Sequence, residues 1–491
     1  MIQFNQPLSQ LIPWIDSIPQ GLLDFTINNI CFDSREVAAG DAFFLLPSVA
    51  GNEQTYIGKA LSQGASVILL DETRVDLVDQ DRDICVTLRN PVEQAGQLIA
   101  GLLYGNTLAL RAIGITGTNG KSSISFYLAQ LLNELQSPCA VMGTLGYGDW
   151  QQLKPTGMTT LPSEKLHNAL LDMSCEFDVV AMEVSSHGLE QNRLAGVKFE
   201  GAVFSNLTRD HLDYHGTMEA YGEAKALLFQ RPEIKFAVVN ADDPFSQVLK
   251  KVSHVVPLTY GCHEKSDLSF KLERYHEQGI DVSFTWEAQT KFISLPLFGA
   301  FNAENVAAAI LVCLQMGFKF SDVISACSKL HPVAGRMQQV NVTTGQPLVL
   351  VDYAHTPDAL EQILKSTRKH VKSGRLILVV GCGGDRDQGK RPLMGKIACQ
   401  YADKVIITSD NPRSENPADI CQQMIDATAG NLVIEIDRQK AIETALGRAE
   451  SHDVVVIAGK GHEDYQEING ERLHFSDVEQ AQAVLKLEIQ A

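Results

Sequence analysis

Short apolar runs with the length of strands alternate with segments of helical periodicity over most of the chain. In residues 122–135, directly after one such run, apolar positions recur at helical spacing. Runs that are apolar throughout and are separated by helices are typical of parallel sheets with both faces covered. The pattern therefore predicts an α/β fold. The strand candidates are residues 42–46, 66–70, 110–116, 178–184, 202–207, 236–240, 348–352, 376–380, 405–408, 432–436 and 454–458.

The same pattern divides the chain into three blocks, at residues 1–105, 106–338 and 339–491. The first block predicts a small α/β domain, and the second a central parallel-sheet domain. In the third block, Thr356-Pro357 and Asn416-Pro417 each place a capping residue before a proline at the first helical position. The third block therefore predicts a Rossmann-like, doubly wound sheet with ligand sites at the carboxyl ends of its strands.

Composition narrows the class of protein. A formal net charge of −18 disfavours binding to nucleic acids and anionic membranes. The ten cysteines include no C-x-x-C pair, which predicts reduced core thiols rather than disulfides or a zinc site. The N-terminus lacks the basic start and the apolar run of a signal peptide, so none is predicted. The apolar stretch 303–318 contains Glu304, which favours a buried helix over a membrane span. We therefore expect a cytoplasmic protein, acting as a monomer on small molecules.

The strongest local signal is residues 114–123, GITGTNGKSS, between a strand candidate and a helix candidate. Glycines let backbone N–H groups approach phosphate oxygens, and the helix N-terminus adds positive potential. Lys121 can contact the terminal phosphates, and the Ser122 hydroxyl can bind magnesium. Ile115 stands where the general phosphate-loop pattern has its first glycine. The loop predicts nucleotide binding, but it leaves ligases, kinases, ATPases and GTP-binding switches open, as well as an ordinary glycine-rich turn.

The sequence G-T-N-G-K resembles the loop of the Mur ligase family, and further motifs agree in the family's order. They are EVSSHG at 183–188, NLTRDHLDYHG at 206–216, GAFNAEN at 299–305, GRM at 335–337 and DYAHTP at 352–357. The resemblance covers all three blocks. It implies an ATP-dependent acid–amino-acid ligase whose N-terminal domain binds a UDP group. The central domain would then bind ATP, and the C-terminal domain the incoming amino acid.

Such a ligase converts a carboxylate into an acyl phosphate, which an amine then attacks, and cations must neutralise the gathering phosphate charge. By resemblance, Lys121 serves the phosphates, while Ser122, Glu183, His211 and Lys225 hold Mg2+, Lys225 as a carbamate (N6-carboxylysine). An amine reacts with carbon dioxide only when neutral, so the pKa of Lys225 should be lowered. The residues expected to bind ATP are Gly117, Thr118, Asn119, Gly120, Lys121, Ser122, Ser123, Asn302, Arg336 and Asp352.

A second set of residues matches positions that hold a UDP-linked muramoyl-peptide precursor. Arg193 facing such an anionic precursor is chemically sensible. Two departures from the family pattern stand nearby: Met158 occupies a position where we expect a polar residue, and residues 47–52 differ from the expected uridine-side loop. The matching residues are Phe32, Ser34, Thr159, Thr160, Ser185, Gln191 and Arg193.

The segments DNPR at 410–413 and GKGHE at 459–463 resemble the branch of the family that adds meso-diaminopimelate during peptidoglycan synthesis. This diamino acid carries one carboxylate more than lysine, and arginine binds a carboxylate through two parallel hydrogen bonds. Arg413 is the obvious partner for that group. The residues expected in this pocket are Arg386, Asp410, Asn411, Pro412, Arg413, Gly459 and Glu463.

Other interpretations remain open. The amine could be L-lysine, or the chain could be a folylpolyglutamate-type ligase; Arg413 argues against the first, and the two motifs E-x-S-S-H and D-N-P-R against the second. A nucleotide-dependent switch needs only the loop around Lys121. Single residues have simpler interpretations too. Glu183 could be a solvated strand-end carboxylate, Lys225 a helix-surface lysine, Asn302 a helix cap, Arg413 a surface ion pair, and His187, His355 and His462 structural histidines.

Overall fold

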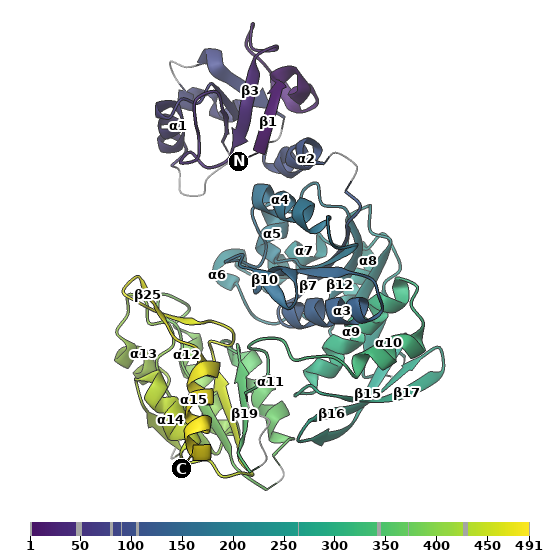
Figure 1. Ribbon diagram of the computed structural model, residues 1–491, viewed down its shortest axis with the longest axis vertical. Coiled ribbons are helices and arrows are strands. Elements are labelled where there is room, and N and C mark those ends of the chain that lie inside the picture. Colours follow the sequence, from purple (N-terminus) through teal and green to yellow (C-terminus); the bar gives the residue numbers. More distant parts are fainter. Residues whose placement is uncertain are drawn as a thin grey trace. The chain divides into compact units, whose positions relative to one another are not determined.

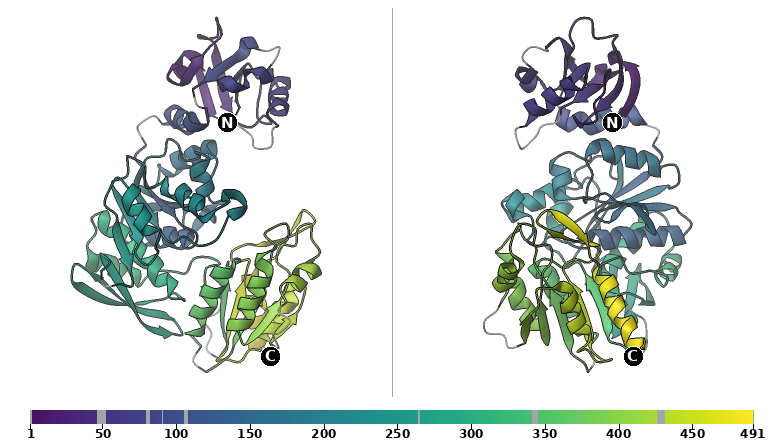
Figure 2. Two further views of the ribbon diagram at one scale, coloured as in Figure 1. Left: turned by 180° about the vertical axis from the view of Figure 1, so that it is seen from behind. Right: turned by 60° about the vertical axis from the view of Figure 1, so that its left-hand side comes forward.

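The structure is a computed structural model that describes residues 2–45, 52–78, 82–89, 91–104, 108–263, 265–340, 345–371, 373–425 and 431–490 (Figures 1 and 2). The chain forms two compact units. The first contains Met1–Gly114, Pro138–Glu200 and Arg231–Ile234, and the second contains Ile115–Ser137, Gly201–Gln230 and Lys235–Ala491. Among the described residues, every helix falls short of the length and apolarity that a membrane span requires.

The first unit opens with a six-stranded sheet in the order β1-β3-β4-β5-β6-β2. Strands β3 to β6 are parallel, and the short edge strands β1 and β2 are antiparallel to their neighbours. Buried apolar side chains line both faces of this sheet, which explains the apolar runs at 42–46 and 66–70. Its elements are β1 (Ile2–Pro7), η1 (Leu8–Trp14), β2 (Ile15–Ser17), β3 (Thr26–Cys31), β4 (Ala42–Phe44), α1 (Glu53–Ser62), β5 (Val67–Leu70), η2 (Glu72–Val78), η3 (Arg82–Ile84), β6 (Cys85–Leu88) and α2 (Pro91–Leu103).

The rest of the first unit carries strands in the order β10-β9-β8-β11-β7, of which β8 and β11 are parallel. Strand β7 begins in the first unit and ends in the second. Helix α2 packs against α4. The elements are β7 (Arg111–Thr116), β8 (Cys139–Gly143), β9 (Gly146–Asp149), β10 (Gln152–Lys154), α4 (Ser163–Met173), β11 (Val179–Glu183) and α5 (Ser186–Glu190).

The second unit continues with β12-β13-β14-β15-β16-β17, parallel from β12 to β15 and antiparallel from β15 to β17. The stretch expected as a buried helix is α9, whose sequence is almost wholly buried and packs against α3. The elements are α3 (Lys121–Glu134), β12 (Phe199–Phe204), α6 (Leu212–His215), α7 (Met218–Ala226), β13 (Phe236–Asn240), α8 (Ser246–Val252), β14 (Leu258–Gly261), β15 (Leu268–His276), β16 (Gly279–Trp286), β17 (Gln289–Leu295), α9 (Phe301–Gln315) and α10 (Phe320–Cys327).

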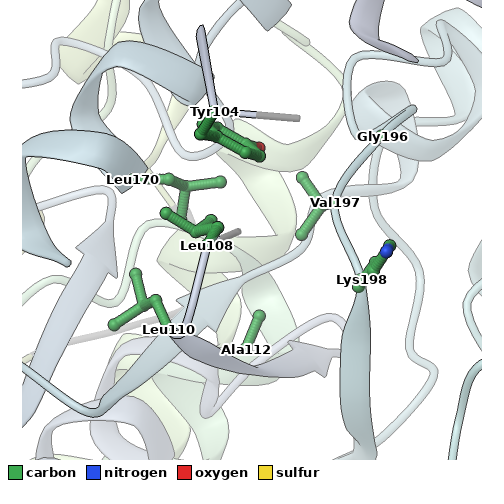
Figure 3. Close-up of a pocket in the computed structure, with 8 residues that line it drawn as sticks. All are labelled: Tyr104, Leu108, Leu110, Ala112, Leu170, Gly196, Val197 and Lys198. Carbon is green, nitrogen blue, oxygen red and sulfur yellow. The ribbon is translucent and has the colours of Figure 1, made fainter. Parts of the chain in front are cut away.

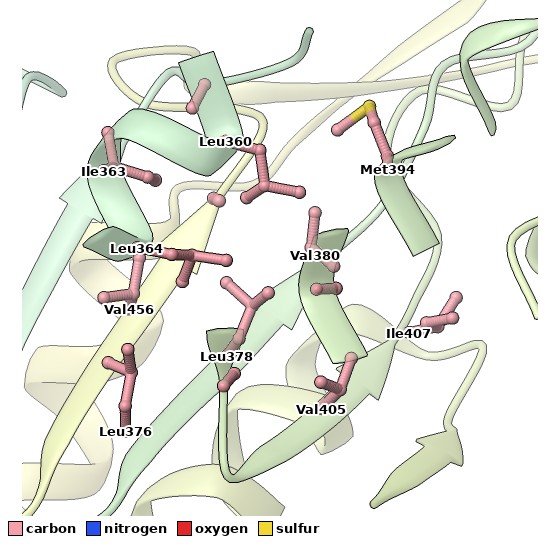
Figure 4. Close-up of a cluster of buried hydrophobic side chains, with 14 of the residues drawn as sticks. Leu360, Ile363, Leu364, Leu376, Leu378, Val380, Met394, Val405, Ile407 and Val456 are labelled. Atoms are coloured by element: carbon pink, nitrogen blue, oxygen red, sulfur yellow. The ribbon is translucent and has the colours of Figure 1, made fainter. Parts of the chain in front are cut away.

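The C-terminal part of the second unit is a doubly wound sheet in the order β18-β19-β23-β20-β21-β22, parallel except for β18. Neighbouring residues of a strand enter different cores. Leu378 packs with side chains of α11 and α12 (Figure 4). Val379 packs with side chains of α14 and α15. The elements are β18 (Gln338–Gln339), β19 (Leu348–Asp352), α11 (Pro357–Arg368), β20 (Leu376–Val380), α12 (Lys390–Tyr401), β21 (Lys404–Ile407), α13 (Pro417–Gln423), β22 (Leu432–Ile434), α14 (Arg438–Leu446), β23 (Val454–Ala458), β24 (Tyr465–Ile468), β25 (Glu471–His474) and α15 (Asp477–Gln490).

Most strand predictions are confirmed, and both predicted caps form. Thr356 Oγ1 accepts a hydrogen bond from Ala359 N at 3.3 Å, and Asn416 Oδ1 accepts one from Ala418 N at 3.0 Å. The strand predicted at 202–207 exists, but its bounds were wrong: β12 spans Phe199–Phe204. It ends there because Ser205 and Asn206 bind the phosphate loop instead. All ten cysteines are free thiols, but Cys175 and Cys262 are exposed rather than in a core.

Candidate active site

The glycine-rich turn between β7 and α3 has the backbone that only glycine adopts without strain. Gly117 has φ 142° and Gly120 has φ 87°. A Cβ atom on Gly117 would lie 1.9 Å from Ser205 Oγ, so a side chain has no room there. Lys121 is the first residue of α3, and Ser122 and Ser123 are buried in its first turn. The turn therefore presents a helix N-terminus of the kind that binds phosphate.

The residues after β12 hold this turn in place. Asn206 O accepts from Thr118 N at 2.8 Å, and Asn206 Oδ1 accepts from Asn119 N at 2.9 Å. The Ser205 hydroxyl donates to Asn119 O at 2.5 Å. Thr118 Oγ1 also accepts from Thr208 N at 3.0 Å. No role is predicted from the sequence for residues 205–208, although Asn206, Leu207 and Thr208 belong to the motif at 206–216.

Two lysines converge on the same backbone oxygen. Lys121 Nζ donates to Gly117 O at 2.9 Å and to Thr118 O at 2.8 Å, and Lys225 Nζ donates to Gly117 O at 3.1 Å. Lys225 is 1 % exposed and lies 4.1 Å from the ring centre of Tyr221. Burial, reinforced by the charge of Lys121, holds the pKa of Lys225 well below its usual range. The interpretation of Lys225 as a helix-surface lysine was therefore wrong.

His211 lies directly before α6 with φ 53°, a left-handed backbone that orients its side chain. The imidazole is about half exposed, and its Nε2 is 3.5 Å from Asp210 Oδ2. Partial burial lowers the pKa of His211, and the nearby charges of Lys121 and Lys225 act in the same direction. The charges of Lys121 and of Lys225 in α7 thus both favour the neutral form of His211.

Asn302, in the first turn of α9, is 1 % exposed. Its Oδ1 accepts from the Tyr127 hydroxyl at 3.0 Å, and its Nδ2 donates to Phe298 O at 2.7 Å. The capping position belongs to Ala300, so the expectation that Asn302 caps the helix was wrong. Its neighbour Asn305 donates to Asn302 Oδ1 at 3.2 Å, which leaves both amides with fixed orientations.

Arg336 and Asp352 lie together at the start of the C-terminal sheet. The guanidinium of Arg336 stacks 4.5 Å from the ring centre of Tyr353. Asp352, the last residue of β19, is buried and accepts from Met337 N at 2.7 Å and Ala354 N at 2.8 Å. Burial raises the pKa of Asp352, while the charge of Arg336 opposes that shift. Asp352 therefore fixes the turn that carries Arg336.

In the first unit, Glu183 ends β11 and is 1 % exposed. Its Oε1 accepts from Thr144 N and its Oε2 from the Thr144 hydroxyl, both at 3.1 Å. A Cβ atom on Gly143 would lie 2.2 Å from Glu183 Oε1, so the glycine makes room for the carboxylate. The interpretation of Glu183 as a solvated carboxylate was therefore wrong, because the carboxylate is buried and both of its oxygens accept hydrogen bonds from Thr144.

The residues expected to hold the precursor form a network beside Glu183 in the first unit. Thr144 Oγ1 and Thr159 Oγ1 are 2.9 Å apart, and Thr160 Oγ1 donates to Glu183 O at 3.2 Å. The Ser185 hydroxyl donates to Thr160 Oγ1 at 3.0 Å. Arg193 donates through Nη1 to Thr160 O at 2.8 Å and through Nε to Gln191 Oε1 at 2.9 Å. Five predicted residues thus share one cluster: Thr159, Thr160, Ser185, Gln191 and Arg193.

Ser34 and Phe32 follow β3 in the N-terminal sheet. Ser34 is buried, and the Phe32 ring lies 5.1 Å from that of Phe44. The exposed Met158 has its sulfur 3.8 Å from Arg193 Nη1. The expected difference at the uridine-side loop concerns residues 47–51, which lie outside the described residues; Asn52 precedes α1.

Three loops of the C-terminal sheet carry the residues expected to bind the amino acid. They follow β20, β21 and β23, which are neighbours and parallel in that sheet, so the loops leave the same edge. Gly384 N donates to Asn411 O at 2.9 Å, and a Cβ on Gly459 would lie 2.6 Å from Asp410 Oδ2. The structure therefore brings together segments 383–386, 410–413 and 459–463.

Arg413 has φ 51°, and its Nη1 donates to Gly384 O at 2.7 Å. Its Nε lies 3.5 Å from Glu467 Oε2, and its side chain is 22 % exposed. On the other side of Asn411, Glu463 Oε2 accepts from Asn411 Nδ2 at 2.8 Å. Burial raises the pKa of Glu463. Arg386 is exposed. The loops thus offer a cation and a carboxylate, the complements of an amino-acid end group.

A small cavity of about 40 Å³ in the first unit is lined by Tyr104, Leu108, Leu110, Ala112, Leu170, Gly196, Val197 and Lys198 (Figure 3). At its edge, the Tyr104 hydroxyl lies 2.6 Å from His167 Nδ1, and His167 Nε2 lies 2.8 Å from Ala195 O. This cavity is too small for a nucleotide and contains no predicted site residue.

Two family models match parts of the chain. Residues 115–313 match the family model described as Mur ligase middle domain, and residues 335–461 match the one described as Mur ligase, glutamate ligase domain. The two matches together cover more than half of the chain. The chain belongs to the Mur ligase family.

Relatives extend the likeness over the full length of this Mur ligase. A UDP-N-acetylmuramoyl-L-alanyl-D-glutamate–2,6-diaminopimelate ligase of Xylella fastidiosa (strain 9a5c) is 41 % identical over 489 residues, which cover 98 % of this chain and 97 % of the relative. A solved structure of a ligase with the same name has a TM-score of 0.73 and 37 % identity, with complete coverage of both chains. The MurF ligase from Thermotoga maritima in complex with ADP has a TM-score of 0.64 over 94 % of this chain and 98 % of its own, but at 18 % identity it shows the fold alone.

Membership of the Mur ligases makes the protein an ATP-dependent ligase that forms amide bonds. The interpretation as a nucleotide-dependent switch without ligase chemistry was therefore wrong. The α/β fold expected from the sequence is confirmed, with its parallel sheets and its doubly wound C-terminal part.

Proposed function

We propose that this Mur ligase joins meso-diaminopimelate to UDP-N-acetylmuramoyl-L-alanyl-D-glutamate in the synthesis of peptidoglycan precursors. The proposal rests on a cation and a carboxylate at one sheet edge. Arg413 lies in the loop after β21 and donates to Gly384 O, and Glu463 in the loop after β23 accepts from Asn411. A diamino acid with a distal carboxylate and ammonium needs both a cation and an anion in its pocket. L-lysine, which lacks that carboxylate, would offer the Arg413 guanidinium no ligand group to bind.

The reaction requires that the precursor carboxylate take the γ-phosphoryl group of ATP, which releases ADP and gives an acyl phosphate. The amine then attacks the carbonyl carbon, the bond to phosphate breaks, and an amide forms. Lys121 and the N–H groups at the start of α3 bind the transferred phosphoryl group in this scheme. Arg336, carried on the turn that Asp352 fixes, and Asn302 contact the nucleotide.

Magnesium prefers oxygen ligands. Of the residues expected to hold it, Ser122 would offer a hydroxyl at the start of α3, Lys225 of α7 would offer oxygens once it carried a carbamate, and His211 would offer a weaker nitrogen ligand. When bound, the ion would neutralise phosphate charge. A buried amine with a lowered pKa is the form that reacts with carbon dioxide, which supports a carbamate on Lys225. The role of Glu183 as a further magnesium ligand stays a prediction.

The proposed division of labour follows the chain. Residues 1–105 would bind the UDP group through Phe32 and Ser34, residues 106–338 would bind ATP and the muramoyl-peptide, and residues 339–491 would bind the amino acid. We propose that the protein acts in the cytoplasm as a monomer on these three small molecules, with Thr159, Thr160, Ser185, Gln191 and Arg193 holding the peptide.

A panel of amines tests the function. Purified protein, Mg2+, ATP and UDP-N-acetylmuramoyl-L-alanyl-D-glutamate are incubated with meso-diaminopimelate, L-lysine or L-glutamate, and peptide product is measured by mass and ADP by a coupled assay. We expect product and ADP together with meso-diaminopimelate, and far less with L-lysine. A matched reaction with a folate acceptor and L-glutamate should give none. Equal turnover with L-lysine, or folate-dependent ADP release, would contradict the proposal.

A further inference from the structure

Lys460 is a fully buried lysine in the loop after β23, and the function described so far gives it no task. Its side chain is 0 % exposed. The Nζ atom donates to Asn411 Oδ1 at 3.1 Å and lies 3.4 Å from Glu463 Oε2. It also lies 5.5 Å from the ring centre of Tyr465. Because a buried cation is costly without partners, these contacts require an explanation.

The first consequence of these contacts is the orientation of the Asn411 amide. Asn411 Oδ1 accepts from Lys460 Nζ at 3.1 Å and from Glu467 N at 3.0 Å. Both partners are donors, so only the oxygen of the amide can face them. Nδ2 must then point the other way, toward Glu463 Oε2 at 2.8 Å. Lys460 therefore fixes which end of Asn411 meets the carboxylate.

The second consequence concerns the two oxygens of Glu463. Oε2 receives Asn411 Nδ2 and the Lys460 ammonium, whereas for Oε1 no hydrogen bond is found in the described part of the chain. Burial raises the pKa of Glu463, and the charge of Lys460 opposes that shift. One carboxylate oxygen is thus held by the protein, and the other remains for a ligand.

A lysine beside an ammonium-binding group does not reverse the charge of this pocket. Asp410 and Glu467 adjoin the same loops, since Asp410 Oδ2 lies next to Gly459 and Glu467 N binds Asn411. Counting Asp410, Glu463 and Glu467 against Lys460 and Arg413, these five side chains keep one negative charge in excess. The buried Arg438, whose charge also acts on Asp410 and Glu463, is paired with Asp477. That excess favours an incoming ammonium.

We propose that Lys460 is a positioning residue of the amino-acid pocket. It orients Asn411 and contacts Oε2 of the Glu463 carboxylate, which leaves Oε1 for the ammonium group of the incoming diamino acid. This inference rests on the proposed function, because it needs a diamino acid in that pocket. The residue acts through Asn411 and Glu463 and touches no reacting atom.

The test is the steady-state kinetics of Lys460→Met, which has similar length and no donor, beside Lys440→Met, an exposed lysine of α14. We expect the KM for meso-diaminopimelate to rise about ten- to a hundred-fold, the effect of losing hydrogen bonds to a charged group. The KM values for ATP and the UDP-dipeptide should stay within about two-fold of wild type. Lys460→Arg, which keeps the charge, should recover part of the loss, and Lys440→Met should behave as wild type.

A double-mutant cycle distinguishes a positioning role from a merely structural one, because it measures the coupling between Lys460 and Asn411. If Lys460 acts through Asn411, Lys460→Met combined with Asn411→Ala should raise the KM by less than the product of the single effects. If the Met variant does not fold by circular dichroism, Lys460→Gln is measured by the same criteria. An unchanged KM for meso-diaminopimelate, an equal rise for all three substrates, or fully multiplicative effects would refute the inference. Absence of product from the wild-type protein would instead refute the proposed function, and the role of Lys460 with it.

Discussion

Replacement of Arg413 by alanine is the most direct perturbation of the proposed specificity. The guanidinium donates to Gly384 O at 2.7 Å and lies 3.5 Å from Glu467 Oε2, which holds it in place within the pocket. Alanine keeps the left-handed backbone of this position at a similar cost, because both residues carry a Cβ atom. The variant therefore removes the cation and its hydrogen bonds and leaves the backbone unchanged.

The magnitude follows from the contact that is lost. A two-bond contact between guanidinium and carboxylate is worth ~2–4 kcal/mol, which corresponds to a fall of roughly thirty- to a thousand-fold in kcat/KM for meso-diaminopimelate. With 22 % of the side chain exposed, Arg413 is more buried than the surface ion pairs that contribute little. L-lysine has no distal carboxylate, so its poor kcat/KM should change much less.

The assay measures kcat/KM for both amines and the KM for ATP with wild type, Arg413→Ala and Arg448→Ala. Arg448 is an exposed arginine of the same sheet domain and serves as the matched control. The selectivity for meso-diaminopimelate over L-lysine should fall in Arg413→Ala alone, with the KM for ATP nearly unchanged. An unaltered kcat/KM, or an equal fall for both amines, would show that Arg413 only braces the loop after β20.

Three further outcomes are expected. Lys121→Ala should abolish ADP formation, since the phosphate loop loses its cation, and normal ligation by that variant would remove the phosphate-loop assignment. Lys225→Arg cannot form a carbamate and should lose most activity, whereas the wild type should lose activity on removal of carbon dioxide and regain it with bicarbonate; indifference of the wild type would contradict the carbamate. Burial lowers the pKa of His167 to about 4, below its unfolded value of about 6.5, so the stability it contributes is present above that value and is lost as the pH falls toward 4. The difference in urea-unfolding free energy between wild type and His167→Gln should therefore shrink over that range. A constant difference would show that the buried His167 does not contribute to the pH dependence of stability.

Local sequence was sufficient to predict many of the buried parallel strands, two helix caps and the phosphate loop. The strands at 236–240, 348–352, 376–380 and 454–458 are found where their apolar runs predict them, because a buried parallel strand needs apolar residues on both faces. Thr356 and Asn416 cap their helices through hydrogen bonds within three residues. The positive φ values of Gly117 and Gly120 likewise belong to the turn itself.

The sequence pattern alone missed the antiparallel ribbon of β15 to β17. Strands β15 and β17 are only partly buried, and in β16 the buried Ile280, Val282 and Phe284 alternate with polar residues. None of the three strands therefore forms the continuous apolar run of the parallel strands. The end of β12 was missed for a related reason. The apolar Leu207 led the prediction to extend the strand to that residue, but Ser205 and Asn206 bind a loop that lies more than eighty residues earlier in the chain.

The chemical environment of the site was decided by tertiary structure. The sequence supplied Lys225, Asn302, Glu183 and Arg413 as candidates, yet each had a simpler interpretation as a surface or capping residue. Only packing buries Lys225 against Gly117, 108 residues away, and turns Asn411 toward Glu463 through Lys460. A pattern of apolar and polar positions specifies which face of an element is buried. It does not specify which distant side chains meet there, and those contacts set the charge, the burial and the hydrogen bonding on which the chemistry depends.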